Sequence, residues 1–315
     1  MSSDNVTSFG GCGRAVTFNQ YRSLLFSIAY RMLGSVADAE DMLQEAFIRW
    51  QAASDNEIHS PKAFLVTIVS RLCITQLHSA RARREAYVGQ WLPEPLLTDQ
   101  QSDPFDVIRA DESLSMALLI LLERLSPLER AVFLLHEVFG FQHTEIAKTL
   151  GKNDASCRQI LHRARAHVGA MRRRFEATAQ EQRDLLDRFL DAAREGNLAR
   201  LIALLLDDAA LHVDADSKTA FPNVIRGADK VARALVAGTK DLPAGIVLRP
   251  TQINGDPGII SYVDGRPFSA LALDIDGDKI RNVYIVANPR KLAHLPVCGD
   301  MATNAHLKGR HEPPA

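Results

Sequence analysis

Residues 142–174 carry the pattern that most constrains the fold of this chain, because two short helical segments meet there at a glycine. Apolar residues recur at helical spacing on both sides of Gly151. Gly151 permits a left-handed turn between the helices, and Asn153 stands where it can cap the second one. The sequence therefore predicts a helix-turn-helix, braced by a further helix that begins at the capping box 126–129 and ends at Gly140. The apolar residues are Ile146, Ala147, Leu150, Ile160, Leu161 and Ala164.

The second of these helices is strongly basic. No acidic residue occurs from Ala155 to Phe175, and the arginines along this stretch would attract phosphates. Polar side chains near its start are able to reach base edges in a major groove. The residues expected to contact DNA are Ser156, Arg158, Gln159, His162, Arg163 and Arg165. The alternative is a solvated basic helix that binds no partner, since basic helices are common.

The chain of 315 residues is long enough for two or three domains. Its net charge of −1 conceals a basic middle and an acidic part after Glu181, which favours a local basic surface over a basic protein. The N-terminus lacks a charged segment followed by a long apolar run, and no apolar stretch approaches the length of a membrane span. We therefore expect a cytoplasmic protein that does not enter a membrane.

The four cysteines are scattered and form no C-x-x-C pair. This spacing predicts neither a disulfide framework nor a zinc site, so we expect free thiols. We predict no metal and no cofactor. The cysteines are Cys12, Cys73, Cys157 and Cys298.

Residues 1–17 are short, polar and glycine-rich, so we expect a mobile tail before the first folded residue, Phe18. Helical spacing then continues to Gly34, a predicted stop. The next helix, residues 35–50, has an apolar stripe and an acidic face opposite it. Clustered carboxylates can bind a metal, but no histidine stands at ligand spacing, so a solvated or partner-facing surface is favoured. The polar residues of that face are Asp38, Asp41, Gln44 and Glu45.

A third helix, within residues 62–89, ends in basic residues. No acidic residue occurs between Ser60 and Arg84, so this helix repeats the pattern expected of a nucleic-acid contact. Two basic helices separated by a linker suggest two points of contact on one DNA. The basic residues are Arg71, His78, Arg81, Arg83 and Arg84.

Residues 90–110 are rich in proline and polar residues and are predicted to form a linker. Trp91 and Leu92 are unusual in such a segment. Because Pro93 and Pro95 hold them in an extended stretch, we expect them to dock on another part of the protein. The alternative is that they only cover a neighbouring helix.

Residues 180–295 change in character from helices to strands. Helices are predicted around residues 185–193, 198–206 and 227–238. Four strands follow, separated by turns rich in Gly, Asn and Asp, at 246–253, 259–263, 268–275 and 280–286. Helices followed by an antiparallel meander predict an α+β domain.

Taken together, these segments resemble a bacterial RNA polymerase sigma factor of the extracytoplasmic-function group. The acidic helix resembles the part that docks on the clamp helices of the polymerase, and the helix-turn-helix resembles the part that reads the −35 promoter element. The resemblance implies region 2 at residues 18–89 and region 4 at residues 111–178, with RNA polymerase core and promoter DNA as partners. Polymerase contacts are implied for Asp38, Asp41, Gln44, Glu45 and Phe47.

The arginine-ended helix resembles the part of such sigma factors that grips and melts the −10 element. A loop ahead of this helix takes a base out of the DNA stack in these proteins, and it corresponds to residues 56–62 here. Contacts with the −10 element are implied for Asn56, Lys62, Arg71, His78, Arg81, Arg83 and Arg84.

Residues 180–295 resemble the SnoaL-like domains of the cone-shaped nuclear-transport-factor fold, which a subgroup of these sigma factors carries at the C-terminus. Residues 91–95 match the linker motif of that subgroup, and residues 288–292 differ from another motif by one residue. Residues 214–218 keep only the outer Asp and Lys of a third. A regulatory contact with the sigma core is implied for Trp91, Leu92, Pro93, Asp214, Lys218, Asn288, Pro289 and Leu292. Residues 296–315 are expected to form a tail.

The leading hypothesis is a promoter-specificity subunit that catalyses no reaction and is controlled by its own C-terminal domain. Two alternatives remain open. In the first, the protein is bifunctional and its cone is an enzyme or a small-molecule sensor, with His212, Asp214 and Asp216 lining the cavity for general acid and base work. In the second, it is a DNA-binding repressor that never contacts polymerase.

Overall fold

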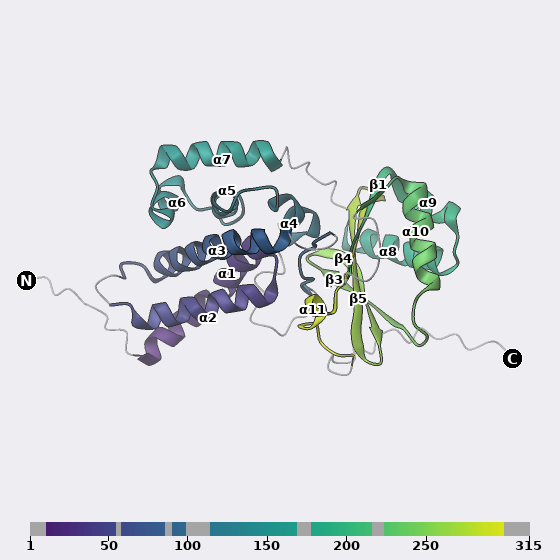
Figure 1. Cartoon of the computed structure of the whole chain (residues 1–315), viewed down its shortest axis with the longest axis horizontal. Helices are drawn as coiled ribbons and strands as arrows, with labels where there is room; N and C mark the ends of the chain where they lie inside the picture. The colour runs from purple at the N-terminus through teal and green to yellow at the C-terminus, as the bar shows by residue number, and fades with distance from the viewer. Residues whose placement is uncertain are drawn as a thin grey trace, which may run out of the picture.

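The computed structural model describes residues 11–54, 58–85, 90–98, 114–168, 178–215 and 224–298. A helical lobe and a lobe built on a β-sheet lie side by side along the long axis of the molecule (Figure 1). The N-terminal helices form the first lobe, and the C-terminal residues form the second. The predicted division into a mainly helical N-terminal part and an α+β C-terminal part is confirmed.

The helix starts and stops that the sequence predicted are present in the helical lobe. Gly34 and Gly151 follow helix ends with positive φ, and the capping box of Ser126 and Glu129 is formed at the start of its helix. That helix changes to π-helical geometry before it ends. The elements are α1 (Gly11–Leu33), α2 (Val36–Ala52), α3 (Pro61–Glu85), α4 (Met116–Leu122), α5 (Pro127–Phe133), η4 (Leu134–Val138), α6 (His143–Leu150) and α7 (Asp154–Val168).

Helix α1 begins at Gly11, earlier than the expected start at Phe18. Buried Arg14 holds this extra turn against α2. Its guanidinium donates to the carbonyl of Trp50 and lies over the indole, while the indole Nε1 donates to the Arg14 carbonyl at 2.9 Å. The expected tail was therefore wrong for residues 11–17. An arginine among small residues carries no apolar periodicity that would have indicated a helix.

The helices α1–α3 and α4–α7 share one hydrophobic core. Arg130 of α5, which is 3% exposed, lies at the junction of the two groups. It donates to the carbonyl of Met32 at 2.6 Å and to that of Leu122 at 2.9 Å, and Glu123 balances its charge at 2.8 Å. Carbonyls in the last turn of a helix lack intrahelical donors. One arginine therefore caps α1 and α4 together and joins the two groups.

The C-terminal domain contains the predicted meander of four antiparallel strands, together with two strands that were not predicted. The first of these runs parallel to the last strand of the meander, so the sheet is not wholly antiparallel. The strand order is β2-β1-β6-β5-β4-β3. The elements are α8 (Ala179–Arg194), α9 (Leu198–Leu204), β1 (Leu205–Ala215), β2 (Val224–Arg226), α10 (Ala228–Lys240), β3 (Val247–Ile253), β4 (Asp256–Val263), β5 (Arg266–Asp276), β6 (Lys279–Ala287) and α11 (Pro289–Leu292).

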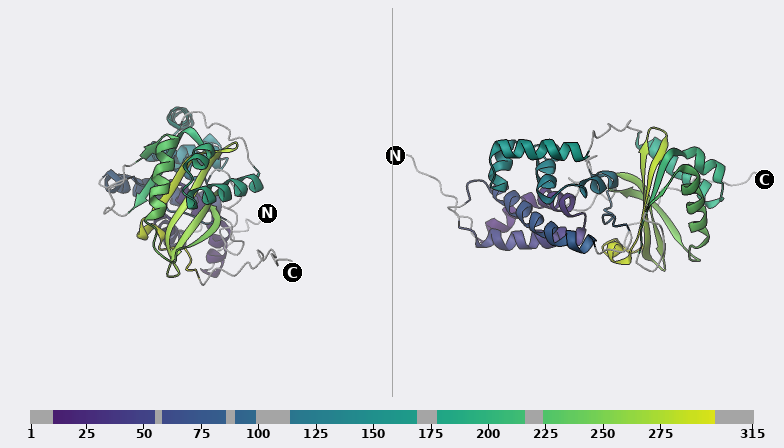
Figure 2. Two further views of the ribbon diagram at one scale, coloured as in Figure 1. Left: turned by 90° about the vertical axis from the view of Figure 1, so that its right-hand side faces the viewer. Right: turned by 45° about the horizontal axis from the view of Figure 1, so that its top comes forward.

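The two faces of this sheet have different coverings. Alternate residues such as Leu211, Leu273 and Val283 form the inner face, which packs against α8, α9 and α10. Their neighbours, among them Ala272 and Tyr284, form the outer face, which packs against the linker, α4 and α11. Figure 2 shows the sheet edge-on between the helical lobe and helix α10. The outer face is therefore the surface on which the sigma-like helices and the C-terminal domain meet.

Replacing Arg130 with Met should destabilise the helical lobe. The carbonyls of Met32 and Leu122 would lose their buried donors, and we expect the free energy of unfolding to fall by about 2–4 kcal/mol. Chemical denaturation followed by circular dichroism measures this change. The same replacement at exposed Arg124 should cost less than about 0.5 kcal/mol; equal effects at the two positions would contradict the capping role.

Candidate functional site

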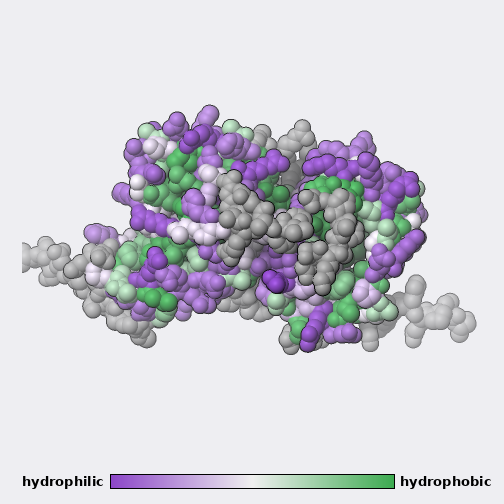
Figure 3. Space-filling model, in the orientation of Figure 1, coloured by the Kyte–Doolittle hydropathy of each residue, from purple (hydrophilic) through white to green (hydrophobic). Residues whose placement is uncertain are grey.

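The predicted helix-turn-helix is present in the helical lobe. Helix α6 ends at Leu150, and Gly151 makes the turn with φ 64°. The side chain of Asn153 then accepts the Ser156 N–H at 2.8 Å, as an N-cap does. Helix α7 lies along the top of the helical lobe, where hydrophilic residues gather on the surface (Figures 1 and 3).

The residues expected to contact DNA on α7 point outward, but two of them carry acidic partners. Arg158 pairs with Asp154 one turn earlier, and Arg165 pairs with Glu137 at 2.5 Å. Residues 155–175 contain no acidic residue, but in the folded protein Asp154 and Glu137 lie next to two of their arginines. Ser156 is half-buried, and the other residues of this set are exposed: Arg158, Gln159, His162, Arg163 and Arg165.

The acidic face of α2 lies opposite its buried stripe, as predicted. Asp41 and Gln44 are exposed, whereas Asp38 accepts from Gln76 at 3.1 Å and Glu45 pairs with Arg49 at 2.7 Å. Phe47 packs edge-on against Phe18, with ring centroids 5.0 Å apart. Ile48, which the sequence analysis did not select, is 62% exposed. The open part of this face consists of Asp41, Gln44 and Ile48.

Two of the residues expected at the −10 element contact the helix-turn-helix in this structure. Arg71 Nε donates to the carbonyl of Thr149 at 2.9 Å, and Lys62 Nζ lies 5.3 Å from the ring centre of Phe141. His78 is exposed. Asn56 and the side chains of Arg81, Arg83 and Arg84 lie outside the described residues, although the backbone of α3 continues to Glu85.

Three buried residues fix the linker to the C-terminal domain, and we call Leu92, Asp214 and Lys291 the linker clamp. Lys291 Nζ lies 2.6 Å from the Asp214 carboxylate and also donates to the Leu92 carbonyl. The same carboxylate accepts the Leu92 N–H at 2.7 Å. The ammonium lies 4.4 Å from the ring centre of Trp91, whose indole packs on Gly34 of the helical lobe. The clamp therefore joins β1, α11 and the linker.

Asn254, at the turn between β3 and β4, contacts helix α1 and both described ends of the linker. Its backbone has a φ of 55°, which Asn tolerates better than most residues. It exchanges hydrogen bonds with the backbone of Leu96, and its side-chain amide donates to the Tyr30 hydroxyl at 2.7 Å and to the Leu114 carbonyl at 3.4 Å. A single buried side chain thus links the first helix, both described ends of the linker and the sheet.

His212 and Asp214 do not line the interior of the cone. They alternate with Leu211 and Val213, which face α8–α10, and so they point to the outer face. Burial, against an opposing hydrogen bond from Asn282, lowers the pKa of His212. The ring is therefore neutral at pH 7, and Nδ1 exchanges a hydrogen bond with the side chain of Gln90 in the linker. The structure therefore does not place these two residues inside the cone, where the alternative of an acid–base site had put them.

The remaining motif residues have different roles. Leu292 is 2% exposed and packs with Leu92 in the outer-face core. Asn288 caps α11, and its side chain accepts the Arg290 N–H at 3.0 Å. Pro289 begins α11 and is exposed, and Pro93 is buried. Asp216 and Lys218 lie outside the described residues.

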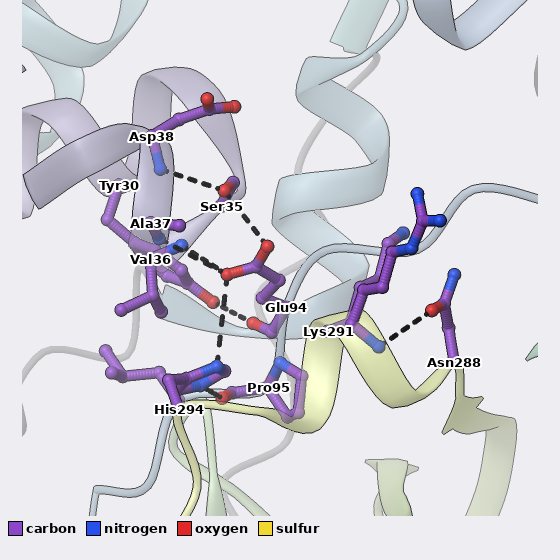
Figure 4. Close-up of polar contacts among 12 residues, drawn as sticks. Tyr30, Ser35, Val36, Ala37, Asp38, Glu94, Pro95, Asn288, Lys291 and His294 are labelled. Carbon is purple, nitrogen blue, oxygen red and sulfur yellow. Dashed lines mark hydrogen bonds and ion pairs between the residues drawn. The ribbon is translucent and has the colours of Figure 1, made fainter. Parts of the chain in front are cut away.

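Lys291, Asn254 and Glu94 are among the residues that the sequence analysis missed, and Lys291 was read only as part of the motif at residues 288–292. Asn254 was read only as part of a turn, and Glu94 only as part of a proline-flanked segment. Glu94 reaches the start of α2, where it accepts the Val36 N–H at 2.7 Å (Figure 4). A polar residue between two prolines is a weak local signal that such a segment makes a specific contact.

Two classes of feature do not occur in the described part of the chain. No group of three or more His, Cys, Asp or Glu side chains there is arranged to hold a metal ion. Among the helices described, none combines the length and the apolar character that crossing a membrane requires.

Comparison with known proteins supports the resemblance seen in the sequence. The family models for sigma-70 region 2 and sigma-70 region 4 match residues 17–83 and 115–168. The extracytoplasmic-function (ECF) RNA polymerase sigma factor SigJ of Mycobacterium tuberculosis is 34% identical over 308 residues, covering 93% of this chain and 97% of the relative. The probable sigma factor SigI of the same organism is 32% identical over 280 residues, covering 88% and 94%.

The similarity extends to the three-dimensional arrangement. The crystal structure of Mycobacterium tuberculosis SigJ superposes with a TM-score of 0.71 at 33% identity, and the match covers 89% of this chain and 98% of that one. Similarity over nearly the whole length includes the linker and the C-terminal domain. The chain is therefore a member of the extracytoplasmic-function family of RNA polymerase sigma factors, the subunits that direct the polymerase to promoters for transcription initiation.

Proposed function

We propose that the C-terminal domain of this sigma factor holds regions 2 and 4 in a closed arrangement and thereby controls their access to promoter DNA. The observation that carries the proposal is the linker clamp, in which Lys291 binds both Asp214 and the Leu92 carbonyl. Most of the free energy of such a buried ion pair is spent on desolvation, so it specifies one arrangement more than it adds stability.

Both described ends of the linker lie on the C-terminal domain. Residues 92–98 contact it through the clamp and through Asn254, and the Thr98 N–H donates to Gln252 in β3 at 3.0 Å. At the other end, Asn254 binds the Leu114 carbonyl, and the Met116 N–H donates to Asp256 at 3.3 Å. A linker held at both ends cannot extend.

Promoter recognition needs an extended linker. The −35 and −10 elements are separate positions on the DNA, whereas regions 2 and 4 pack on one shared hydrophobic core in this structure. The linker between Glu85 and Met116, residues 86–115, has 30 residues and spans at most about 100 Å when fully extended. Regions 2 and 4 therefore reach both elements only if the linker leaves the C-terminal domain and the two regions separate.

The packing of region 2 on region 4 supports the same conclusion. Arg71 lies against Thr149 of the helix-turn-helix, and Lys62 lies against Phe141, which directly precedes it. Neither side chain faces a carboxylate in these contacts, so phosphates would compete well for both cations once the regions part. In the closed arrangement these side chains are instead committed to protein.

We assign polymerase and −35 contacts to the exposed surfaces of α2 and α7. On α2 the open face of Asp41, Gln44 and Ile48 offers an acidic group beside an apolar one, a combination suited to a basic protein surface. On α7, Arg158 and Gln159 lie near the helix start, where recognition helices reach bases.

The packing on the two faces of the sheet supports the proposal that the C-terminal domain is a regulator rather than an enzyme. Its inner face packs with apolar residues against α8, α9 and α10. The polar pair His212 and Asp214 binds the linker through Gln90 and Leu92. The groups that an acid–base mechanism would use are thus employed in holding the linker.

Releasing the clamp should raise transcription. Changing Asp214→Asn and Lys291→Met together removes both charges without leaving one buried alone. At saturating core polymerase we expect promoter-dependent transcription in vitro to rise roughly fivefold or more, a coupling of ordinary size. The matched control is Asp229→Asn with Arg233→Met, which removes an exposed ion pair of α10. Wild-type output from the clamp variant would contradict the proposal.

Replacing Asn254 with Gly should open the molecule while keeping the positive φ of the turn. The side-chain hydrogen bonds to Leu96, Tyr30 and Leu114 would be lost, at roughly 1 kcal/mol each. We expect a larger radius of gyration in small-angle X-ray scattering. Asp264→Gly is the control, because Asp264 is also a non-glycine residue with positive φ, 49°, but is exposed. An unchanged radius of gyration in the Asn254 variant would show that its hydrogen bonds do not hold the closed arrangement.

Reversing one charge on α2 tests the polymerase surface. Asp41→Lys should weaken binding to core polymerase by roughly tenfold or more, since a like charge would face the basic partner. Glu45→Lys should weaken it less, because Glu45 is already paired with Arg49. The control is Asp187→Lys on exposed α8. Affinity measured by biolayer interferometry distinguishes these outcomes. Equal affinity for all variants would mean that α2 is not part of the polymerase interface.

A further inference from the structure

The first turn of α2 is capped by a residue from the linker. Ser35 supplies the local cap, accepting the Asp38 N–H at 3.1 Å. The carboxylate of Glu94 accepts from the Ser35 hydroxyl at 3.0 Å and from the Val36 N–H at 2.7 Å (Figure 4). Negative charge is favoured at a helix N-terminus, and hydrogen bonds to a carboxylate are stronger than neutral ones.

The C-terminal domain holds the same short segment from its other side. The ring of His294, just after α11, makes a 2.8 Å hydrogen bond with the carbonyl of Pro95. Two residues before Glu94, the Leu92 carbonyl accepts from Lys291. In region 2, the Tyr30 hydroxyl donates to the Glu94 carbonyl at 2.6 Å. The position of Glu94 is therefore set jointly by the end of α1 and by α11.

The capped helix is the one to which we assign polymerase binding. Glu94 contacts residues 35–37, whereas Asp41, Gln44 and Ile48 lie further along α2 and stay exposed. The contact therefore does not cover the polymerase surface. It fixes the first turn of the helix that carries this surface.

We infer that Glu94 is a positioning residue through which the C-terminal domain sets the affinity of α2 for core polymerase. The inference rests on the proposed function, because it requires the clamp to hold the linker. When the clamp is closed, Glu94 stays on α2 and the helix is presented in one orientation. When the clamp opens, this cap leaves with the linker and only the Ser35 cap remains.

The test is the affinity of full-length protein for core polymerase, measured for Glu94→Ala, for the clamp variant Asp214→Asn with Lys291→Met, and for the combination. We expect Glu94→Ala to weaken binding roughly fivefold. The clamp variant should weaken it by a similar factor, and the combination by no more than Glu94→Ala alone, because both changes remove the same contact. Glu94→Gln should restore most of the affinity, since its amide oxygen still accepts the Val36 N–H.

Two controls separate positioning from a general loss of structure. Glu181→Ala removes a capping carboxylate of the same kind from α8 and should leave polymerase affinity unchanged. Binding of Glu94→Ala to duplex DNA carrying the −35 element should also stay unchanged, because α7 does not contact Glu94. Loss of both kinds of binding would mean misfolding and would overturn the inference.

The inference and the proposed function fail in different ways. If Glu94→Ala binds polymerase as wild type does, or if its effect simply adds to that of the clamp variant, the inference is wrong. The proposed function would still stand if the clamp variant changed transcription. If the clamp variant transcribes as wild type, the proposed function itself is wrong.

Discussion

The ammonium group of Lys291 is the charge on which the arrangement of the molecule depends. It is almost wholly buried, so its desolvation must be offset by the Asp214 carboxylate, the Leu92 carbonyl and the face of Trp91. Together with Lys291 itself, these groups come from three distant segments, β1, the linker and α11. The linker is therefore either docked in one register or not docked at all, which is the behaviour expected of a switch between two states rather than of a graded contact.

Cations in this protein serve mainly as connectors between its parts. Arg130 caps two helices from different regions, and Arg71 donates to the carbonyl of Thr149 near the end of α6. Arg158 and Arg165 are paired with acids beside or within the motif. A reading of the chain by charge alone counts these residues as available for phosphate. In the structure some of these cations join one part of the protein to another, whereas others, such as Arg163, are exposed on α7.

Local patterns in the sequence predicted local structure well, and long-range contacts poorly. Gly151 and Asn153 determine the helix-turn-helix through their own backbone preferences, and the strands of the meander were visible from their turns. Asn254 and Glu94 act on partners far away in sequence, and nothing next to them in the chain indicates this. The misplacement of His212 has a related cause: the strand that carries it, β1, was not predicted, and only the tertiary structure shows which face of the sheet the helices cover.

The parallel pairing of β1 with β6 has a consequence for the order of events during synthesis. Because the two strands run in the same direction, their ends lie together, and this brings Asp214 beside the helix that follows β6. Lys291 is thus made only after regions 2 and 4 and all six strands of the sheet, and domains generally begin to fold in the order in which they are made. A growing chain has both promoter-reading regions but no clamp. The clamp can form only once translation has passed Lys291, and a chain terminated before that residue would lack it.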